Sequence, residues 1–131
     1  MTTDTWFDQC KQLANDLKAI RPIPAVGARE KFDFPGVYIF SEKAGQVIYV
    51  GESHDIPSRL DRHFGRLRRD GTPMPVGLRS TPHRTVHAKG LAWPWDYLCN
   101  QEVRAIEIDD PHMRKHVERA LILELNPIAN P

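Results

Sequence analysis

Hydrophobic and polar positions follow two different periods in the first part of the chain, and each period predicts one kind of element. From Trp6 to Ile20 the apolar residues recur at helical spacing. Pro22 and Pro24 then end this helix, because proline cannot continue it. Residues 36–40 and 46–50 are two apolar runs joined by "SEKAG", a connection that suits a β-hairpin. The pattern therefore predicts a packing helix followed by a hairpin.

The second part of the chain is predicted to contain a helix, a strand and a last helix, with a long irregular segment before the strand. Residues 55–70 read as a helix with Asp55 as its N-cap and Pro57 in its first turn. Residues 72–98 have little periodicity and are predicted to be an irregular basic loop, which in a compact domain is usually functional or disordered. "EVRAIEI" at 102–108 alternates with a period of two and predicts a half-exposed strand. A last helix follows, capped by Asp109 or Asp110, with Pro111 at its start and its end before residue 127.

These elements predict the fold class. The expected order is helix, strand, strand, helix, basic loop, strand, helix, and strands joined by a short loop pair antiparallel. We therefore expect an α/β protein of the α+β type, with a small antiparallel three-stranded sheet flanked by helices. A chain of 131 residues is one domain by length. Within this single domain, residues 1–33 form the additional N-terminal helix and linker, and residues 34–131 form the core.

Composition excludes several classes of protein. Hydrophobic residues make up 40% of the chain and charged residues 27%, which are ordinary values for a globular protein. No apolar stretch approaches the roughly 18 residues that cross a membrane, and the N-terminus lacks the apolar core of a signal peptide. Cys10 and Cys99 have no metal-binding or redox spacing. We expect them to be reduced, buried thiols in a cytoplasmic protein that binds no membrane.

Charge is distributed unevenly, although the net charge of the chain is only +1. Residues 56–92 carry eight basic and two acidic side chains, a net charge of +6, whereas the remainder carries −5. A basic belt on an acidic body is the pattern expected for a polyanionic partner such as nucleic acid. The ordinary alternative is a solvated run of charges.

Four residues from separate elements are candidates for chemistry. Tyr38 and Tyr49 lie in the two hairpin strands, where a tyrosine by itself is more often a packing residue. Arg59 leads the cationic side of a helix that begins just after the second strand, which places it near Tyr49. Glu118 lies at the edge of the apolar face of the last helix, where a carboxylate is unfavourable unless it is paired, hydrogen-bonded or metal-bound.

These residues fall in sequence motifs that resemble those of the GIY-YIG nuclease family. "GVY" ends at Tyr38, "YVG" begins at Tyr49, and the family's helical arginine falls on Arg59. The family's metal-binding glutamate falls on Glu118, and its terminal Pro-x-x-Asn motif ends at Asn130. The resemblance covers about residues 34–131. Any one of these motifs alone has little weight, but five in order on the expected elements are specific.

The resemblance implies a metal-dependent endonuclease that hydrolyses phosphodiester bonds in nucleic acid, most readily DNA. Glu118 would hold Mg²⁺ or Mn²⁺, and Arg59 would bind the phosphate through its planar guanidinium. We favour Tyr49 as the general base and Tyr38 as the residue that orients water or phosphate, although the family uses both positions as the base. Asn130 would support the site.

The resemblance and the basic belt together predict the residues that contact nucleic acid. The expected contacts are Gly51, Arg62, His63, Arg66, Arg68, Arg69, Arg84, His87 and Lys89. Gly51 has an equally good packing interpretation. Contacts to phosphate supply affinity rather than sequence choice, so recognition of a target would come from structure, from the 72–92 loop or from a protein partner. The oligomeric state is not fixed by the sequence.

Several features leave alternatives open. Many relatives have a non-acidic residue after the second glycine, whereas this chain has Glu52, which would repel phosphate, bind a second cation or pair with Arg59 or Arg62. Glu118 has an ion pair with Arg114 or Arg119 as its ordinary explanation.

The aromatic segment "WPWDY", with Trp93, Trp95 and Tyr97, favours packing over base stacking, and His112 and His116 favour exposed histidines over a metal pair. The alternative functions are a non-cleaving nucleic-acid-binding module with the same fold, or an RNA-directed nuclease or toxin.

Overall fold

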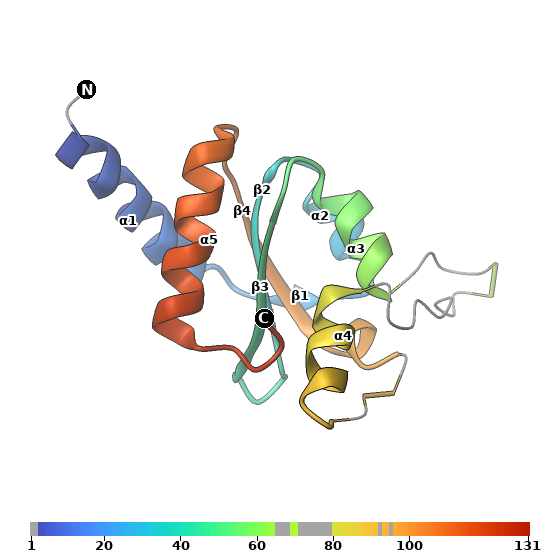
Figure 1. The fold of residues 1–131 in the computed structure, drawn as a ribbon. Helices are drawn as coiled ribbons and strands as arrows, with labels where there is room; N and C mark the ends of the chain where they lie inside the picture. The colour runs from blue at the N-terminus through green and yellow to red at the C-terminus, as the bar shows by residue number, and fades with distance from the viewer. Residues whose placement is uncertain (1–2, 65–68, 71–79, 92, 95) are drawn as a thin grey trace.

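The computed structural model describes residues 3–64, 69–70, 80–91, 93–94 and 96–131. Figure 1 shows its elements in chain order. They are α1 (Thr3–Ala19), β1 (Ile23–Pro24), α2 (Ala28–Lys31), β2 (Gly36–Ser41), β3 (Val47–Ser53), α3 (Ile56–Phe64), α4 (Thr81–Ala88), the short 3₁₀ helix η2 (Leu98–Asn100), β4 (Glu102–Glu107) and α5 (Pro111–Leu125).

The described strands form one antiparallel sheet in the order β1-β4-β2-β3, which confirms the α+β class. The prediction of three strands is wrong, because the sheet has a fourth strand, β1. Ile23 and Pro24 pair with Val103 and Glu102 of β4. A strand of two residues has no periodicity to detect, and its proline is tolerated because β1 lies at the edge of the sheet.

Alternation along the hairpin sends side chains to two different faces. Tyr38 lies opposite Gly51, and Phe40 lies opposite Tyr49, so the two tyrosines share one face of the sheet. Val37 and Ile39, the β2 residues on either side of Tyr38, point to the other face. The hairpin prediction is confirmed, and β3 extends three residues beyond the predicted end at position 50.

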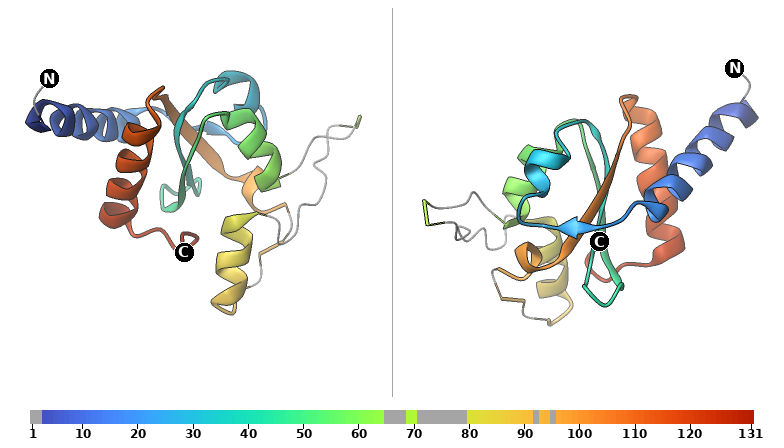
Figure 2. Two further views of the ribbon diagram at one scale, coloured as in Figure 1. Left: turned by 45° about the horizontal axis from the view of Figure 1, so that its top comes forward. Right: turned by 180° about the vertical axis from the view of Figure 1, so that it is seen from behind.

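Helices cover both faces of the sheet. In Figures 1 and 2, α1 and α5 lie on one side of the sheet, and α2, α3 and α4 lie on the other. The hydrophobic core is correspondingly divided into two clusters, one on each face. Cys10 is buried in the cluster beneath α1 and α5, and Cys99 is buried in the cluster on the face of α3 and α4, as expected for structural thiols.

The helix caps follow local chemistry. Asp55 accepts a hydrogen bond from the Ser58 backbone N–H at the start of α3, and Asp110 accepts one from the His112 N–H at the start of α5. The described part of α3 ends at residue 64, and residues 65–68 of the predicted helix lie outside the described residues. None of the described helices combines the length and apolar character that crossing a bilayer requires.

Part of the predicted basic loop is a helix. The segment "TPHRTVHA" forms α4, whose buried side is made by Pro82, His83 and Val86. Its proline falls in the first turn, where no hydrogen bond is lost. The prediction of an irregular segment is therefore wrong for residues 81–88, because a two-turn helix rich in Pro, His and Arg shows too few apolar positions to reveal a period.

Among the side chains of the open alternatives, the described aromatic residues and one histidine take part in packing. The rings of Trp93 and Tyr97 stack at 4.4 Å and lie against the core, whereas Trp95 is outside the described residues. His116 contacts Trp6 and Phe7 at ring distances of 5.1 Å, between α5 and α1. These contacts support the packing interpretation of the aromatic segment. His112 is exposed as expected, whereas the expectation of an exposed side chain is wrong for His116, which is half-buried between the two helices.

Candidate active site

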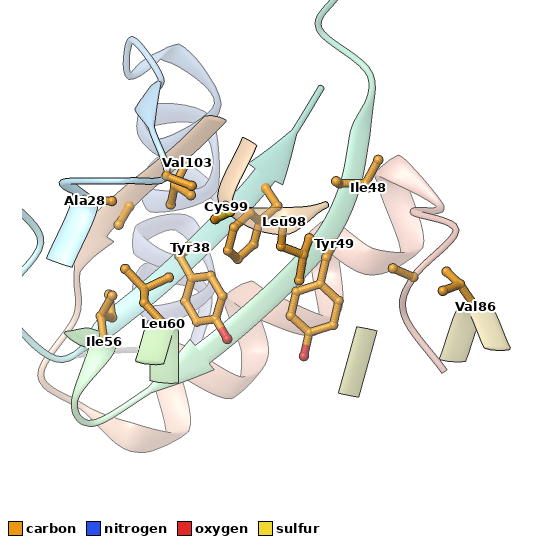
Figure 3. Packing of buried hydrophobic residues seen from close by; sticks show 14 residues of the cluster. Ala28, Tyr38, Ile48, Tyr49, Ile56, Leu60, Val86, Leu98, Cys99 and Val103 are labelled. Atoms are coloured by element: carbon orange, nitrogen blue, oxygen red, sulfur yellow. The ribbon is translucent and has the colours of Figure 1, made fainter. Parts of the chain in front are cut away.

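Two phenol groups lie side by side on the face of the sheet beneath α3. Tyr38 comes from the central strand β2 and Tyr49 from the edge strand β3, and their ring centroids are 6.2 Å apart. Figure 3 shows both hydroxyl groups pointing to the same side of the cluster. Tyr38 is completely buried, while Tyr49 retains 6% of its exposure. Tyr49 is therefore the phenol with some access from solvent.

Gly51 makes room for one of these rings. A Cβ atom at this position would meet the ring and hydroxyl of Tyr38, the residue opposite it across the hairpin. The glycine is therefore required because any side chain would displace the phenol. Of the two interpretations open in the sequence, this contact supports packing rather than approach of a phosphate.

His63 lies inside this face and binds Tyr38 directly. Its Nε2 is 2.7 Å from the Tyr38 hydroxyl, and its Nδ1 is 3.0 Å from the hydroxyl of Ser80, just before α4. Burial, followed by the positive charge of Arg59, lowers the pKa of His63 to about 3, so the imidazole is neutral at physiological pH. One ring nitrogen carries the proton and donates a hydrogen bond, and the other accepts one.

The structure leaves His63 no free ring nitrogen for the contact to nucleic acid that the sequence predicts. The side chain is only 2% exposed, and both ring nitrogens already have partners, so none remains for a phosphate. Sequence spacing contained a signal for this, because His63 lies seven residues after Ile56 and three after Leu60, on the buried side of α3. Nothing in the sequence pointed to Ser80, which becomes its partner only through the fold.

The outer edge of β3 is covered by side chains and by the end of the chain. The Asn130 side chain accepts a hydrogen bond from the Val50 N–H at 2.9 Å and donates one to the Val50 carbonyl at 2.8 Å. The Ala129 N–H donates to the carbonyl of Ile48 at 2.9 Å. Asn130 thus holds the backbone on the strand residue that follows Tyr49, which is a supporting position.

Glu118 reaches the same edge from the opposite face. Its helix α5 packs on the other side of the sheet from α3, but its carboxylate accepts a hydrogen bond from the Glu52 backbone N–H on β3. Burial, followed by the negative charge of the Glu52 side chain, raises the pKa of Glu118 to about 7. The hydrogen bond from the Glu52 backbone and the positive charge of Arg59 oppose this rise. Carboxylate and phenols therefore meet around the edge strand rather than on one face.

Glu52 pairs with a residue that the sequence did not suggest for it. Its carboxylate accepts a hydrogen bond from Arg114 Nε at 3.0 Å, and the same guanidinium donates to the carbonyls of Ile108 and Asp109. Of the three alternatives open for Glu52, pairing with Arg59 or Arg62 is therefore not the one found, because the carboxylate pairs with Arg114. The ion pair of Glu118 with Arg114 is also excluded, because Arg114 is engaged at Glu52.

The charge of Arg59 reaches every titratable group of this cluster. The half-buried guanidinium lowers the pKa of Tyr38, Tyr49, His63 and Glu118, although in each case burial has the larger effect. An arginine in this position favours negative charge on a phenol, on the carboxylate or on a bound phosphate. The four residues that the sequence singled out are thus brought together around β3.

Neither phenol ionises readily in this environment. Burial raises the pKa of Tyr38 well above 10, and the neighbouring Tyr49 adds to this rise. Burial raises the pKa of Tyr49 to about 12, with Glu118 as the second cause and Arg59 opposing both. Arg59 alone is therefore insufficient to make a phenolate near neutral pH, and further positive charge is needed near Glu118.

The described basic residues of the belt lie on the exposed sides of α3 and α4 and beyond. Arg62 and Arg84 are exposed and line a cavity between the two helices, and Arg69 is exposed in a turn. His87 is exposed on α4, while Lys89 donates a hydrogen bond to the Ile128 carbonyl near Asn130. Arg66 and Arg68 lie outside the described residues.

The sequence matches a known family over the hairpin, α3 and α4. Residues 34–89 match the model of the family described as "GIY-YIG catalytic domain". No solved structure gives a significant match.

Similar curated proteins carry the name UvrABC system protein C. The one from Methanosarcina acetivorans is 32% identical over 89 residues, which are 68% of this chain and 15% of the relative. The one from Paenarthrobacter aurescens is 41% identical over 76 residues, or 57% of this chain and 10% of the relative. The chain therefore spans only a small part of the length of these relatives.

Proposed function

Because residues 34–89 place the chain in the GIY-YIG nuclease family, we propose that it is an endonuclease that hydrolyses phosphodiester bonds in DNA with a divalent cation. The observation that carries the proposal is the meeting of Tyr38, Tyr49, Arg59 and Glu118 around the edge strand β3. Separate elements on both faces of the sheet contribute these groups. Packing alone gives no reason for a guanidinium, a carboxylate and two phenols to share one electrostatic environment.

Glu118 has the chemistry expected of a ligand for Mg²⁺ or Mn²⁺. Burial, followed by the nearby charge of Glu52, raises the pKa of its carboxyl to about 7, so a cation would relieve an unfavourable ionisation. Oxygen ligands suit both ions, and Mg²⁺ retains several waters, so one carboxylate can suffice. Among the described residues no three His, Cys, Asp or Glu side chains form a metal cluster, so water and substrate would complete the coordination.

When bound, the cation would offset the negative charge that develops on the phosphate oxygens. Arg59 would hold the same phosphate through two N–H groups, a contact that lysine makes poorly. Asn130 would keep the β3 backbone in place beside Tyr49. This chain's own residues would thus supply the binding and the orientation of the reacting group.

Tyr49 would take the proton from the attacking water. The negative charge of Glu118 is the second cause of the raised pKa of Tyr49, so neutralising Glu118 would make its phenolate more accessible. Tyr38 is fixed by its hydrogen bond to the neutral His63 and would orient water or phosphate. Both hydrogen bonds of the neutral His63 ring can form at once: Nδ1–H donates to the Ser80 hydroxyl, and Nε2 accepts from the Tyr38 hydroxyl.

A plasmid assay tests the proposed function. Supercoiled DNA incubated with the full chain and Mg²⁺ should be nicked, and Mn²⁺ should substitute for Mg²⁺ while chelation stops the reaction. Glu118→Ala prepared in parallel should show no nicking. Equal nicking by both proteins would mean contamination, and no nicking of any DNA structure by the wild type would refute the proposal.

The same assay separates the alternatives. A non-cleaving binding module would bind DNA without cutting it at any metal concentration. The sequence features that favour this alternative are Glu52 and the small size of the chain, and the pairing of Glu52 with Arg114 bears only on the first. An RNA-directed nuclease would cut single-stranded RNA in preference to duplex DNA when the two compete.

A further inference from the structure

A small cavity lies between α3 and the start of α4, beside the cluster of phenols. Its volume is about 180 Å³. The lining residues come from the two helices and from the turn before α4, and they are Arg59, Arg62, His63, Ser80, Thr81 and Arg84. Sites for drug-sized molecules are larger, roughly 300 Å³ or more. This cavity has the size for a single compact group.

The lining is strongly cationic. Three of its side chains are guanidinium groups, and none is a carboxylate. The acid nearest to Arg62 in sequence, Asp61, pairs with Arg29 at 3.0 Å instead. The ion pairs found in the described part of the chain use neither Arg59 nor Arg62. The guanidinium groups of Arg59 and Arg62 repel each other in this small space unless an anion lies between them.

Two hydroxyl groups hold other lining residues of the cavity in place. Thr81 Oγ1 accepts a hydrogen bond from Arg84 at 3.0 Å, which holds this guanidinium at the mouth of the cavity. The Ser80 hydroxyl is already bound to His63 Nδ1. Arginine forks match the oxygen geometry of phosphate better than that of a spherical anion.

The cavity is one ring away from the candidate active site. His63 lines it, and the other nitrogen of the same ring binds the Tyr38 hydroxyl at 2.7 Å. Arg59 lines it as well and acts electrostatically on Tyr49 and Glu118. A strand whose scissile phosphate lies at Tyr49 and Glu118 would therefore bring a neighbouring phosphate to the cavity.

We propose that this cavity binds a second phosphate group of the nucleic-acid strand, next to the phosphate that is cut, through Arg62 and Arg84. This inference rests on the proposed function. Arg59 lies between the two phosphates and is shared by both. Two fixed phosphates on one strand would set the direction in which the strand crosses β3. The group is either an internal phosphodiester or a terminal phosphate at a nick, and both present the same oxygens.

Charge-neutral linkages test the proposal directly. The full chain carrying Glu118→Ala, which should bind without cutting, is titrated with fluorescent DNA duplexes by anisotropy. Arg62→Gln and Arg84→Gln are added singly and together, and Arg21→Gln, an exposed arginine near the far edge of the sheet, is the matched control. A series of duplexes carries one neutral methylphosphonate at each successive position, and another carries a nick with or without a 5′-phosphate.

The proposal predicts about tenfold weaker binding for each cavity variant and a salt dependence reduced by about one phosphate contact. At one methylphosphonate position binding should weaken equally, and there Arg62→Gln and Arg84→Gln should have no further effect. If the 5′-phosphate at the nick alone produces this pattern, the bound group is terminal, and otherwise it is internal.

Two outcomes would overturn the proposal, and they are distinguishable. If Glu118→Ala binds DNA and the wild type cuts it, but the cavity variants bind as tightly as Arg21→Gln, the second phosphate site is wrong and the proposed function stands. If the wild type neither binds nor cuts nucleic acid, the proposed function falls, and this inference falls with it.

Discussion

The two faces of the sheet bury different kinds of side chain. The face beneath α3 and α4 buries two phenols, an imidazole and a hydroxyl, contributed by Tyr38, Tyr49, His63 and Ser80. The face beneath α1 and α5 is filled mainly by aliphatic side chains such as Leu121. Buried polar groups on this side and at its edge include Arg114, which binds Glu52 and the Ile108 carbonyl, and Asn130, which binds the Val50 backbone. Buried polar groups reduce stability unless they are fully paired, whereas each buried aliphatic side chain adds about 1.5–3 kcal/mol.

This difference indicates that one face mainly stabilises the fold, while the other face carries the groups that would take part in the reaction. The aliphatic face supplies the free energy that allows the other face to hold polar groups away from water. Glu118 is the link between them, because its helix packs on the aliphatic face while its carboxylate reaches the edge strand. Substitutions on the two faces should therefore separate the loss of activity from the loss of stability.

The largest effects are expected at the charged pair that spans the edge. Arg59→Ala and Glu118→Ala should each reduce the rate of DNA cleavage by about 10³-fold, because each removes charge that stabilises the transition state. Their thermal unfolding should change little, since both side chains are partly exposed. Arg119→Ala, the exposed neighbour on α5, is the control and should cut at the wild-type rate. A large drop in melting temperature without loss of activity would contradict these separate roles of the two faces.

The reverse pattern is expected on the aliphatic face. Leu121→Ala should lower the free energy of unfolding by about 2–5 kcal/mol, because it leaves a cavity beneath α5. The folded fraction should retain a cleavage rate close to that of the wild type. Leu123 is 74% exposed on the same helix, and Leu123→Ala should change stability by less than about 0.5 kcal/mol. Urea titrations followed by rate measurements below the transition would detect any exception.

The phenols provide a finer comparison within the polar face. Tyr49→Phe should reduce the cleavage rate by about 10²-fold or more, because it removes the proposed general base. Tyr38→Phe should reduce it less but should also destabilise the protein, since His63 Nε2 loses its partner in a buried site. Single-turnover rates at saturating DNA check the order. A larger rate loss for Tyr38→Phe would exchange the two roles.

The smallest effect concerns the pH dependence of stability. The folded pKa of His63 is about 3 and its unfolded value about 6.5, so the unfolded state binds more protons between these values. The free energy of unfolding should therefore fall as the pH drops below 6.5, by up to about 1.4 kcal/mol per pH unit from this residue. His63→Gln should show a shallower slope than the wild type between pH 7 and 5. A slope in His63→Gln equal to that of the wild type would mean that His63 is accessible to protons in the folded state.

Local patterns in the sequence were sufficient for much of the fold. Alternation identified the hairpin and β4, and the caps and proline of α5 located that helix correctly. β1 and α4 were missed because a two-residue strand and a short helix have too few positions for a period. These elements depend on tertiary partners, β4 in the first case and the buried face of α3 in the second.

The candidate site was only partly visible in the sequence. The motifs brought Tyr38, Tyr49, Arg59 and Glu118 into one hypothesis, and the fold places them around β3. The partnership of Glu52 with Arg114 and the burial of His63 were not anticipated. Both depend on the rotation of a helix about its axis and on contacts across 62 and 25 positions of the chain, which one-dimensional spacing does not determine.

The claim that groups from opposite faces act at one point across β3 is tested most directly by a double-mutant cycle of cleavage rates for Tyr49→Phe and Glu118→Gln. If both side chains act on the same phosphate, the double variant should be no slower than the slower single variant within about threefold. Multiplication of the two separate losses in the double variant would show that the two groups act independently, and would contradict the account.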